Sequence, residues 1–270
     1  MVTHTLGGDL ALALQAASNA DLVSLNRFMA QDLHVTTKPD RTPVTDADKA
    51  TEDIIRSTIR ASRPDDSIFG EEGGSDGSTD GTHTGRQWII DPIDGTAGFL
   101  RGLPIWATLI ALVIDGVPQV GVVSAPAMKK RWWAATGHGA WATHDGNRTP
   151  QRLGVSAVAS LSDAVLSYNS LQGWMQDGRF PQLTSLAEKV WRTRAIGDFW
   201  SYMLVAEGLL DIAGEPDLKP YDIAALVPIV KEAGGRFSSL DGEDSMWKGT
   251  ALATNGLVHD DVLSVTRRAQ

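Results

Sequence analysis

Apolar residues recur at spacings of three and four near the start of the chain, which is the spacing of one helix face. We therefore predict an amphipathic helix whose inner face comprises Leu10, Leu14, Ala17, Leu22, Leu25 and either Phe28 or Met29. A second helix is predicted from about Thr45 until Pro64, because proline cannot continue a helix. Its inner face is expected to contain Ile54, Ile55, Thr58 and Ile59.

From residue 67 to residue 144 the apolar positions instead form short runs between glycine-rich or acidic turns, as β-strands do. Asp115-Gly116 and Asp145-Gly146 have the composition of tight turns. The expected strands cover residues 67–70, 87–91, 105–114, 120–124, 131–136 and 140–144. Most of this region is predicted to form an antiparallel meander.

Strands and helices are predicted to alternate in the rest of the chain. The strands are expected at residues 164–168, 190–195, 209–213 and 251–254. The helices are expected at residues 198–208, at 220–233 and from 257 onward. Helices followed by a sheet and then by alternating elements are typical of a layered α/β sandwich. We expect two halves, residues 1–150 and residues 151–270.

Composition and charge exclude several classes of function. The 270 residues carry 33 acidic and 24 basic side chains, a net charge of -9, which disfavours nucleic acid and anionic membranes as partners. The absence of cysteine excludes disulfides, thiolate nucleophiles and cysteine-bound metals. The six histidines form no zinc-binding pattern. Phosphate chemistry on so acidic a chain would need local positive charge, such as a bound metal.

The ends and the apolar runs bear on location. Residues 1–9 lack a basic run followed by an apolar core, so no signal peptide is expected. The longest apolar stretch, residues 105–114, is too short to span a bilayer. The expected compartment is therefore the cytoplasm.

The sharpest chemical feature is the segment Trp88-Ile89-Ile90-Asp91-Pro92-Ile93-Asp94-Gly95-Thr96, in which an apolar strand ends in two aspartates. Asp, Pro and Gly are common turn residues, so this segment alone is equally consistent with an ordinary turn. Glu71 ends the preceding strand, however, and Asp222 begins a later helix. Carboxylates are the ligands that magnesium prefers. The three acidic points together therefore favour a metal site.

The segment at 88–96 resembles the first signature of the inositol monophosphatase family, and Pro220–Gly235 resembles the second. The resemblance extends over nearly the whole chain. It implies the α-β-α-β-α sandwich of the inositol monophosphatase and fructose-1,6-bisphosphatase type. It also implies a homodimeric, lithium-sensitive phosphomonoesterase that uses two or three Mg²⁺ ions.

The resemblance assigns roles position by position. Its implied metal ligands are Glu71, Asp91, Asp94, Asp222 and the carbonyl of Ile93. Thr96 resembles the hydroxyl that positions the attacking water with Glu71, and the amides of Gly95 and Thr96 would hold the phosphate. Two positions depart from the family pattern: Gly98 stands where asparagine is usual, and Tyr221 where tryptophan is usual. Neither change removes a ligand.

Two further residues have competing interpretations. Asp48 fits the capping box that opens a helix at Thr45, and it also resembles a family aspartate beside an additional metal position. Lys38 resembles a family lysine near that position but is equally consistent with a solvated surface lysine. Residues 73–86 are nearly all Gly, Ser, Thr and Asp, which is typical of a flexible surface loop or of a mobile flap.

The substrate is indicated by residues 191–199 and by Glu215, which resemble the histidinol-phosphate phosphatases of the family. Gly197, Asp198 and Glu215 would line the substrate pocket; alternatively, Asp198 is a helix N-cap and Glu215 a solvated carboxylate. Inositol phosphate, fructose bisphosphate and nucleotide phosphates remain alternative substrates. A non-catalytic magnesium or phosphate-sugar binding protein is the alternative of a different class, disfavoured by the Glu71–Thr96 pair.

Overall fold

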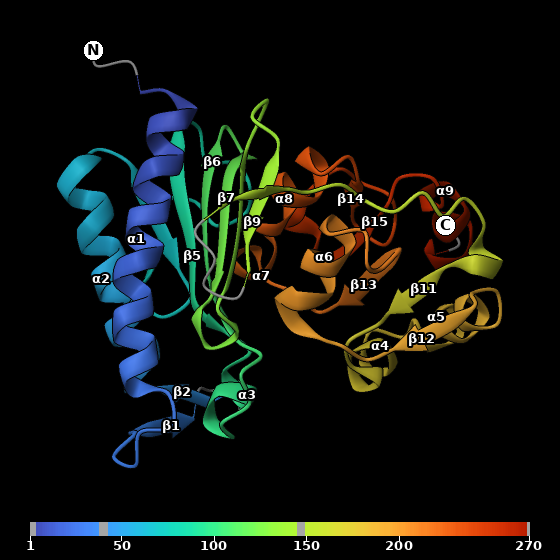
Figure 1. The fold of residues 1–270 in the computed structure, drawn as a ribbon, viewed down its shortest axis with the longest axis horizontal. Helices are drawn as coiled ribbons and strands as arrows, with labels where there is room; N and C mark the ends of the chain where they lie inside the picture. The colour runs from blue at the N-terminus through green and yellow to red at the C-terminus, as the bar shows by residue number, and fades with distance from the viewer. Residues whose placement is uncertain (1–3, 38–42, 145–148, 269–270) are drawn as a thin grey trace.

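A computed structural model describes residues 4–37, 43–144 and 149–268, and the predicted turn at Asp145-Gly146 lies outside these ranges. Helices α1 (Leu6–Arg27) and α2 (Asp46–Ser62) form the first layer of the fold. They lie side by side against one face of a large sheet (Figure 1). Thr45 caps α2 with the predicted capping box, and Ile55 and Ile59 are fully buried as expected.

The inner face of α1 differs from the predicted one. Leu22 is 75% exposed and Leu25 is 44% exposed, whereas the buried positions are mainly alanines. The residues of α1 that are buried in the core are Leu12, Ala13, Ala16, Ala17 and Ala20. Alanine allows α1 to approach the sheet and α2 closely, so alanines mark the packed face together with Leu10, Leu12 and Leu14.

The second layer is the large sheet, which is antiparallel except where β3 and β5 run parallel. In spatial order its strands are β10 (Gln151–Arg152), β9 (Ala140–Thr143), β8 (Lys130–Ala135), β7 (Val117–Ala125), β6 (Ala107–Ile114), β5 (Arg86–Asp94), β3 (Ser67–Gly70) and β4 (Gly74–Ser75). The predicted meander is therefore confirmed, with the tight turn at Asp115-Gly116 joining β6 to β7. Two shorter strands, β1 (Val35–Thr37) and β2 (Pro43–Thr45), pair separately.

The third layer consists of α6 (Asp198–Ala206) and α8 (Leu226–Glu232), which pack between the large sheet and a smaller one. The helix predicted over residues 220–233 is in fact two helices, α7 (Pro220–Ile223) and α8. Pro228 has no N–H to donate to the carbonyl of Ala224, so the helical ladder is broken there.

The fourth layer is the smaller sheet, of mixed direction. In spatial order its strands are β12 (Arg192–Arg194), β11 (Val165–Ser167), β13 (Ile212–Pro216), β15 (Thr250–Thr254) and β14 (Arg236–Ser238). The strand predicted at 209–213 begins only at Ile212, because the amides of Leu209 and Leu210 still bond to the carbonyl of Leu204 at the end of α6.

The fifth layer covers the outer face of the smaller sheet with α4 (Leu171–Gln176), α5 (Phe180–Ala187) and α9 (His259–Thr266). The order of layers confirms the predicted α-β-α-β-α sandwich (Figure 1). The division at residue 150 stays a prediction. The large sheet ends at Arg152, and the first strand of the smaller sheet begins at Val165.

Candidate metal and substrate site

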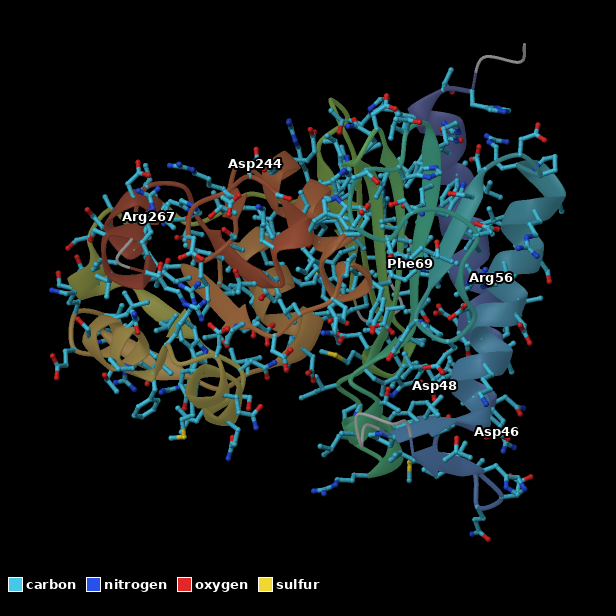
Figure 2. All side chains as sticks on the ribbon, turned by 180° about the vertical axis from the view of Figure 1, so that it is seen from behind. Asp46, Asp48, Arg56, Phe69, Asp244 and Arg267 are labelled. Carbon is cyan, nitrogen blue, oxygen red and sulfur yellow. The ribbon has the colours of Figure 1, made fainter. Side chains whose placement is uncertain are left out.

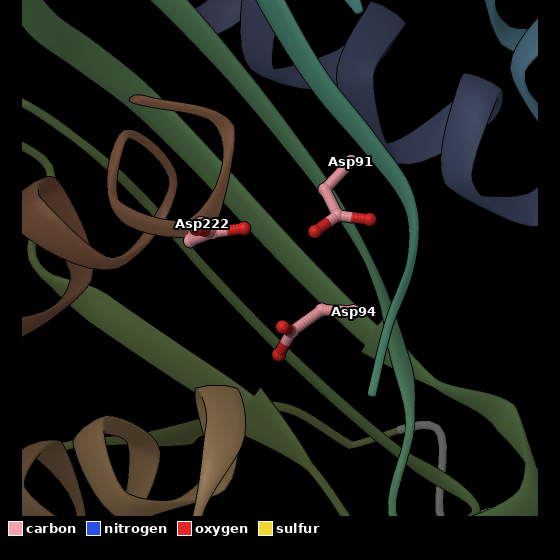
Figure 3. A group of neighbouring side chains, drawn as sticks. All are labelled: Asp91, Asp94 and Asp222. Atoms are coloured by element: carbon pink, nitrogen blue, oxygen red, sulfur yellow. The ribbon is translucent and has the colours of Figure 1, made fainter. Parts of the chain in front are cut away.

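The two aspartates of β5 are brought together by an irregularity at the end of the strand. Pairing of β5 with β6 shifts register between Asp91 and Asp94, where Pro92 cannot donate to a ladder. The hydroxyl of Thr108 donates to the carbonyl of Pro92 over 2.8 Å, and the amide of Ile93 donates to Asp91 over 3.0 Å. These bonds hold both carboxylates toward the same space (Figure 3).

Asp222 reaches that space from α7, on the opposite side of the site. The backbone amide of Lys219 donates to its carboxylate over 2.7 Å, which fixes the side chain at the start of the helix. Asp91, Asp94 and Asp222 each offer one carboxylate oxygen, and these oxygens lie within 4.8 Å of one another (Figure 3). Residues 131 positions apart in sequence therefore share one site.

Glu71 lies beside this group because it follows β3, which runs parallel to β5. Gly70 is paired with Ile90, and the amide of Glu71 donates to the carbonyl of Ile90 over 3.1 Å. Its negative charge raises the pKa of both Asp91 and Asp222. The structure therefore brings all four predicted carboxylate ligands into one neighbourhood.

Electrostatics make this neighbourhood fit a divalent cation. Burial raises the pKa of Asp91 and of Asp94 well above the usual value, and repulsion from nearby carboxylates raises both further. Burial likewise raises the pKa of Asp222 to about 7. A bound cation would reverse both causes, because positive charge favours the ionised carboxylates.

Thr96 and Asp48 approach the cluster together. The Thr96 hydroxyl donates to the carbonyl of Ile93 over 2.9 Å and lies 3.4 Å from Oδ1 of Asp48. The other oxygen of Asp48 accepts from the amide and the hydroxyl of Thr45. The two interpretations of Asp48 are thus compatible, since one side chain caps α2 and faces Thr96. Lys38 lies outside the described residues.

Gly95 turns the chain from β5 into α3 (Thr96–Leu100). It has φ 86°, in the left-handed region, and a Cβ there would lie 2.9 Å from the carbonyl oxygen of Ile105. Its own carbonyl accepts from the amides of Gly98 and Phe99. Glycine is therefore required at this position by both conformation and space.

A cavity of about 180 Å³ adjoins the cluster and contains the predicted substrate residues Asp198 and Glu215. Its lining comprises Asp94, Asn169, Asp198, Phe199, Tyr202, Glu215, Leu218, Asp222 and Leu226. The amide of Phe199 donates to Asp94 over 2.8 Å, which ties the cavity to the acidic cluster. Gly197, rather than Asp198, occupies the N-cap position of α6.

Glu215 is buried rather than solvated, and its partners were not found by sequence reasoning. Tyr202 donates to it over 2.9 Å, and the Asn169 side-chain amide donates to its other oxygen. Burial raises the pKa of Glu215 to about 8, against the lowering effect of these two bonds. The one available signal for Asn169 was its place just after the predicted strand at 164–168.

Asp198 and Gly197 have unusual backbone conformations next to this cavity. Asp198 has φ 49° and Gly197 has φ 86°. A Cβ at Gly197 would lie 2.6 Å from Oδ1 of Asn169, so only glycine leaves the Asn169 side chain in place. Burial raises the pKa of Asp198 as well. The cavity thus combines the buried carboxylate of Glu215 and the partly buried carboxylate of Asp198 with the acidic cluster.

Comparison with known proteins agrees with this geometry. The sequence profile described as the inositol monophosphatase family matches residues 9–270. The histidinol-phosphatase of Mycobacterium tuberculosis is 57% identical over 95% of this chain and 96% of its own length. That of Streptomyces coelicolor is 50% identical over 94% of this chain and 95% of its own length. The structure of an IMPase/NADP phosphatase, solved with NADP and Ca²⁺, superposes on this chain with a TM-score of 0.83 and 25% sequence identity. The match covers 98% of this chain and 97% of that structure.

Proposed function

Since the chain belongs to the inositol monophosphatase family and is a phosphomonoester hydrolase, we propose that it hydrolyses histidinol phosphate with the aid of Mg²⁺. The identity of 57% to a histidinol-phosphatase over almost the whole chain carries this proposal. The cavity supports it, because Asp198 and Glu215 offer negative charge to a substrate that bears a primary ammonium.

We assign metal binding to Glu71, Asp91, Asp94, Asp222 and the carbonyl of Ile93, with Asp48 beside an additional position. The donor set is all oxygen, and burial and repulsion raise the pKa of Asp91, Asp94 and Asp222, so the cluster carries an excess of negative charge that a cation would offset. Bound Mg²⁺ would neutralise developing charge on the phosphoryl group and acidify water. Two or three ions per site remain the expectation.

The chain's own groups would orient the reactants. Thr96 gives its proton to the Ile93 carbonyl, so its oxygen lone pairs are directed to accept a bond from the attacking water. Glu71 would accept a proton from the same water. The amides of Gly95 and Thr96, at the left-handed turn into α3, would donate to phosphoryl oxygens. No covalent enzyme intermediate is needed for this displacement.

Substrate selection is assigned to the other end of the cavity. Asp198 and Glu215 would pair with the substrate ammonium, with Gly197 keeping space for Asn169. Tyr202 and Asn169 hold the two Glu215 oxygens, so the carboxylate is fixed before substrate arrives. The positive charge of the ammonium would lower the raised pKa of Glu215 and favour its ionised form.

A side-by-side turnover assay tests the proposal. Histidinol phosphate, inositol phosphate, fructose bisphosphate and a nucleoside monophosphate would be compared in Mg²⁺ and in EDTA. We expect the highest kcat/KM for histidinol phosphate and no turnover in EDTA. Preference for inositol phosphate would refute the substrate assignment, and metal-independent turnover would refute the metal assignment.

The predicted homodimer and the cytoplasmic location remain predictions. Among the residues that the structure describes, no helix is long and apolar enough to cross a membrane. Light scattering of the purified protein would measure the oligomeric state directly.

A further inference from the structure

A buried carboxylate outside the acidic cluster holds the turn that carries Glu71. Glu52 lies on α2, is 2% exposed, and accepts from the backbone amides of Glu72 over 2.8 Å and Gly73 over 2.9 Å. Burying a carboxylate is costly unless its oxygens are satisfied by donors. Each oxygen of Glu52 accepts a hydrogen bond from one of the two residues that follow Glu71.

Arg56, one helical turn further along α2, completes the attachment. Its Nε donates to Glu52 over 2.6 Å, and its Nη2 donates to the carbonyl of Gly74 over 2.5 Å. Arg56 and Asp48 belong to the same helix (Figure 2). Asp48, which faces Thr96, lies one turn before Glu52. Successive turns of α2 therefore contact Thr96 and the turn that carries Glu71, the two groups predicted to position the attacking water.

The glycines around Glu71 are explained by this attachment. A Cβ at Gly70 would overlap the carboxylate of Glu52, and a Cβ at Gly73 would lie 2.7 Å from Oε1 of Glu52 and 2.9 Å from Nε of Arg56. Neither glycine has a positive φ, so the requirement is for space rather than for conformation. The sequence Gly70-Glu71-Glu72-Gly73 is therefore shaped to fit the Glu52 side chain.

An ion pair four residues apart on a helix can serve helix stability alone. That role does not account for the two hydrogen bonds that Glu52 accepts from the backbone amides of Glu72 and Gly73, because these connect α2 to the turn after β3. Residues that orient a metal ligand through hydrogen bonds commonly change metal affinity by about 10- to 100-fold when they are replaced.

We propose that Glu52 is a positioning residue that fixes the carboxylate of Glu71 for metal binding, an inference that rests on the proposed metal-dependent function. Arg56 bonds to both the Glu52 carboxylate and the carbonyl of Gly74, and so holds Glu52 against the turn. Loss of the Glu52 carboxylate frees the amides of Glu72 and Gly73, and the turn then holds Glu71 in several positions rather than one.

Isothermal titration of Mn²⁺ into the metal-free protein tests this without relying on activity. In Glu52→Gln an NH₂ group replaces one of the two acceptor oxygens. Whichever way the side-chain amide is turned, this NH₂ faces a backbone N–H of the turn and cannot accept its hydrogen bond, so the turn is released. We expect Mn²⁺ affinity to fall by about tenfold or more. Asp53→Asn is the matched control, because it removes the same charge from the neighbouring, exposed position of α2 and should keep affinity within about twofold.

Gly73→Ala provides a second variant that keeps every charge. Its methyl group would displace Glu52 and Arg56, so Mn²⁺ affinity should fall in the same direction. Thermal unfolding in EDTA would establish that each variant is folded before titration. If Glu52→Gln does not fold, unchanged affinity in folded Gly73→Ala would overturn the proposal.

A double-mutant cycle separates positioning from a general structural role. If Glu52 acts through Glu71, then Glu52→Gln should have little further effect on Mn²⁺ affinity in a Glu71→Gln background. Full additivity of the two losses, or Mn²⁺ binding by Glu52→Gln equal to that of the wild type, would overturn the inference. A wild-type protein that binds no Mn²⁺ would instead refute the proposed metal-dependent function.

Discussion

Two groups of buried and partly buried carboxylates lie at opposite ends of β5, and their negative charge is offset in different ways. At the start of the strand, Asp9 is fully buried and bonds to Arg63 and Arg86, each over 2.9 Å. Arg86 also bonds to Asp66, which accepts from the indole of Trp88. At the other end, no described lysine or arginine forms an ion pair with any member of the acidic cluster (Asp91, Asp94 and Asp222).

We interpret the difference as that between a structural group and the proposed functional one. The arginine-paired group (Asp9, Asp66, Arg63 and Arg86) has its charge balanced within the chain, so it stabilises the contact between α1, α2 and β5. The acidic cluster receives backbone hydrogen bonds from Phe199 and Lys219, but burial and mutual repulsion still raise the pKa of its carboxylates, which is a cost to folding at neutral pH. Burial with compensation indicates structure, and burial without it indicates a place for an added cation.

The largest expected effect of breaking the acidic cluster is on catalysis. Asp94→Asn should lower kcat for histidinol phosphate by about a thousandfold or more, because transition-state stabilisation of several kcal/mol depends on the metal site. The same change should leave the melting temperature in EDTA unchanged or higher, since it removes a buried, repelled charge. Steady-state kinetics in saturating Mg²⁺ and calorimetry in EDTA would measure both. Near wild-type turnover would remove the metal assignment.

The arginine-paired group should respond in the opposite way. Asp9→Asn leaves two arginines partly uncompensated, and removal of one partner from a buried pair costs about 3–5 kcal/mol of unfolding free energy. Because Asp9 lies on α1, against the end of β5 opposite to the site, kcat per folded molecule should be unchanged. Urea unfolding and active-site titration would test the two statements separately. A loss of kcat without a loss of stability would contradict the distinction.

The parts of the site that sequence reasoning predicted are those set by local order. Asp91, Pro92 and Asp94 lie at the end of a single strand, so the residues that interrupt the strand and those that carry the carboxylates are adjacent in sequence. Glu52, Asn169 and Tyr202 were missed because their hydrogen-bond partners lie 20, 46 and 13 residues away in sequence and are brought together only by the fold. Nothing in the spacing of Glu52 on α2 distinguishes it from a surface glutamate.

The fold shows the same limit. The order of the main strands and helices followed from hydrophobic period, although α4, α5 and β14 were not predicted. That order indicated a layered α/β sandwich, and the family resemblance implied its five layers. The packed face of α1 was predicted only in part: Leu10, Leu14 and Ala17 pack as expected, whereas Leu22 and Leu25 are exposed. The contribution of Ala13 and Ala16 was missed because leucine was given more weight than alanine. The loop at 73–86 is bonded to its surroundings through Asp76, which accepts from the amide of Ile68. Whether it acts as a flap stays a hypothesis.

The pH dependence of stability extends the comparison into the substrate cavity. The pKa of Glu215 rises from 4.5 to about 8 on folding, so between these values the folded protein binds a proton that the unfolded chain does not. Stability in EDTA should therefore fall as pH rises through this window, by up to about 1.4 kcal/mol per pH unit for one proton. Above the folded pKa the dependence should disappear.

Glu215→Gln removes that proton linkage while Tyr202 and Asn169 can still bond to the side chain, because the Asn169 amide can rotate. Urea unfolding in EDTA at pH 5.5, 6.5 and 7.5 should give a shallower decline for Glu215→Gln than for the wild type. The acidic cluster would account for the decline that remains. Parallel profiles would show that Glu215 is not protonated in the folded, metal-free protein.

The smallest expected effect concerns substrate selection by Asp198, whose left-handed conformation makes asparagine the suitable replacement. Asp198→Asn keeps the shape of the side chain and removes the charge that would pair with the substrate ammonium. A charge-assisted hydrogen bond contributes about 1.5–3 kcal/mol, so KM for histidinol phosphate should rise by about tenfold to a hundredfold. KM for a small uncharged phosphomonoester should stay within about twofold, because the acidic cluster is intact. Equal losses for both substrates would instead place Asp198 with the metal ligands, since Phe199 next to it already bonds to Asp94.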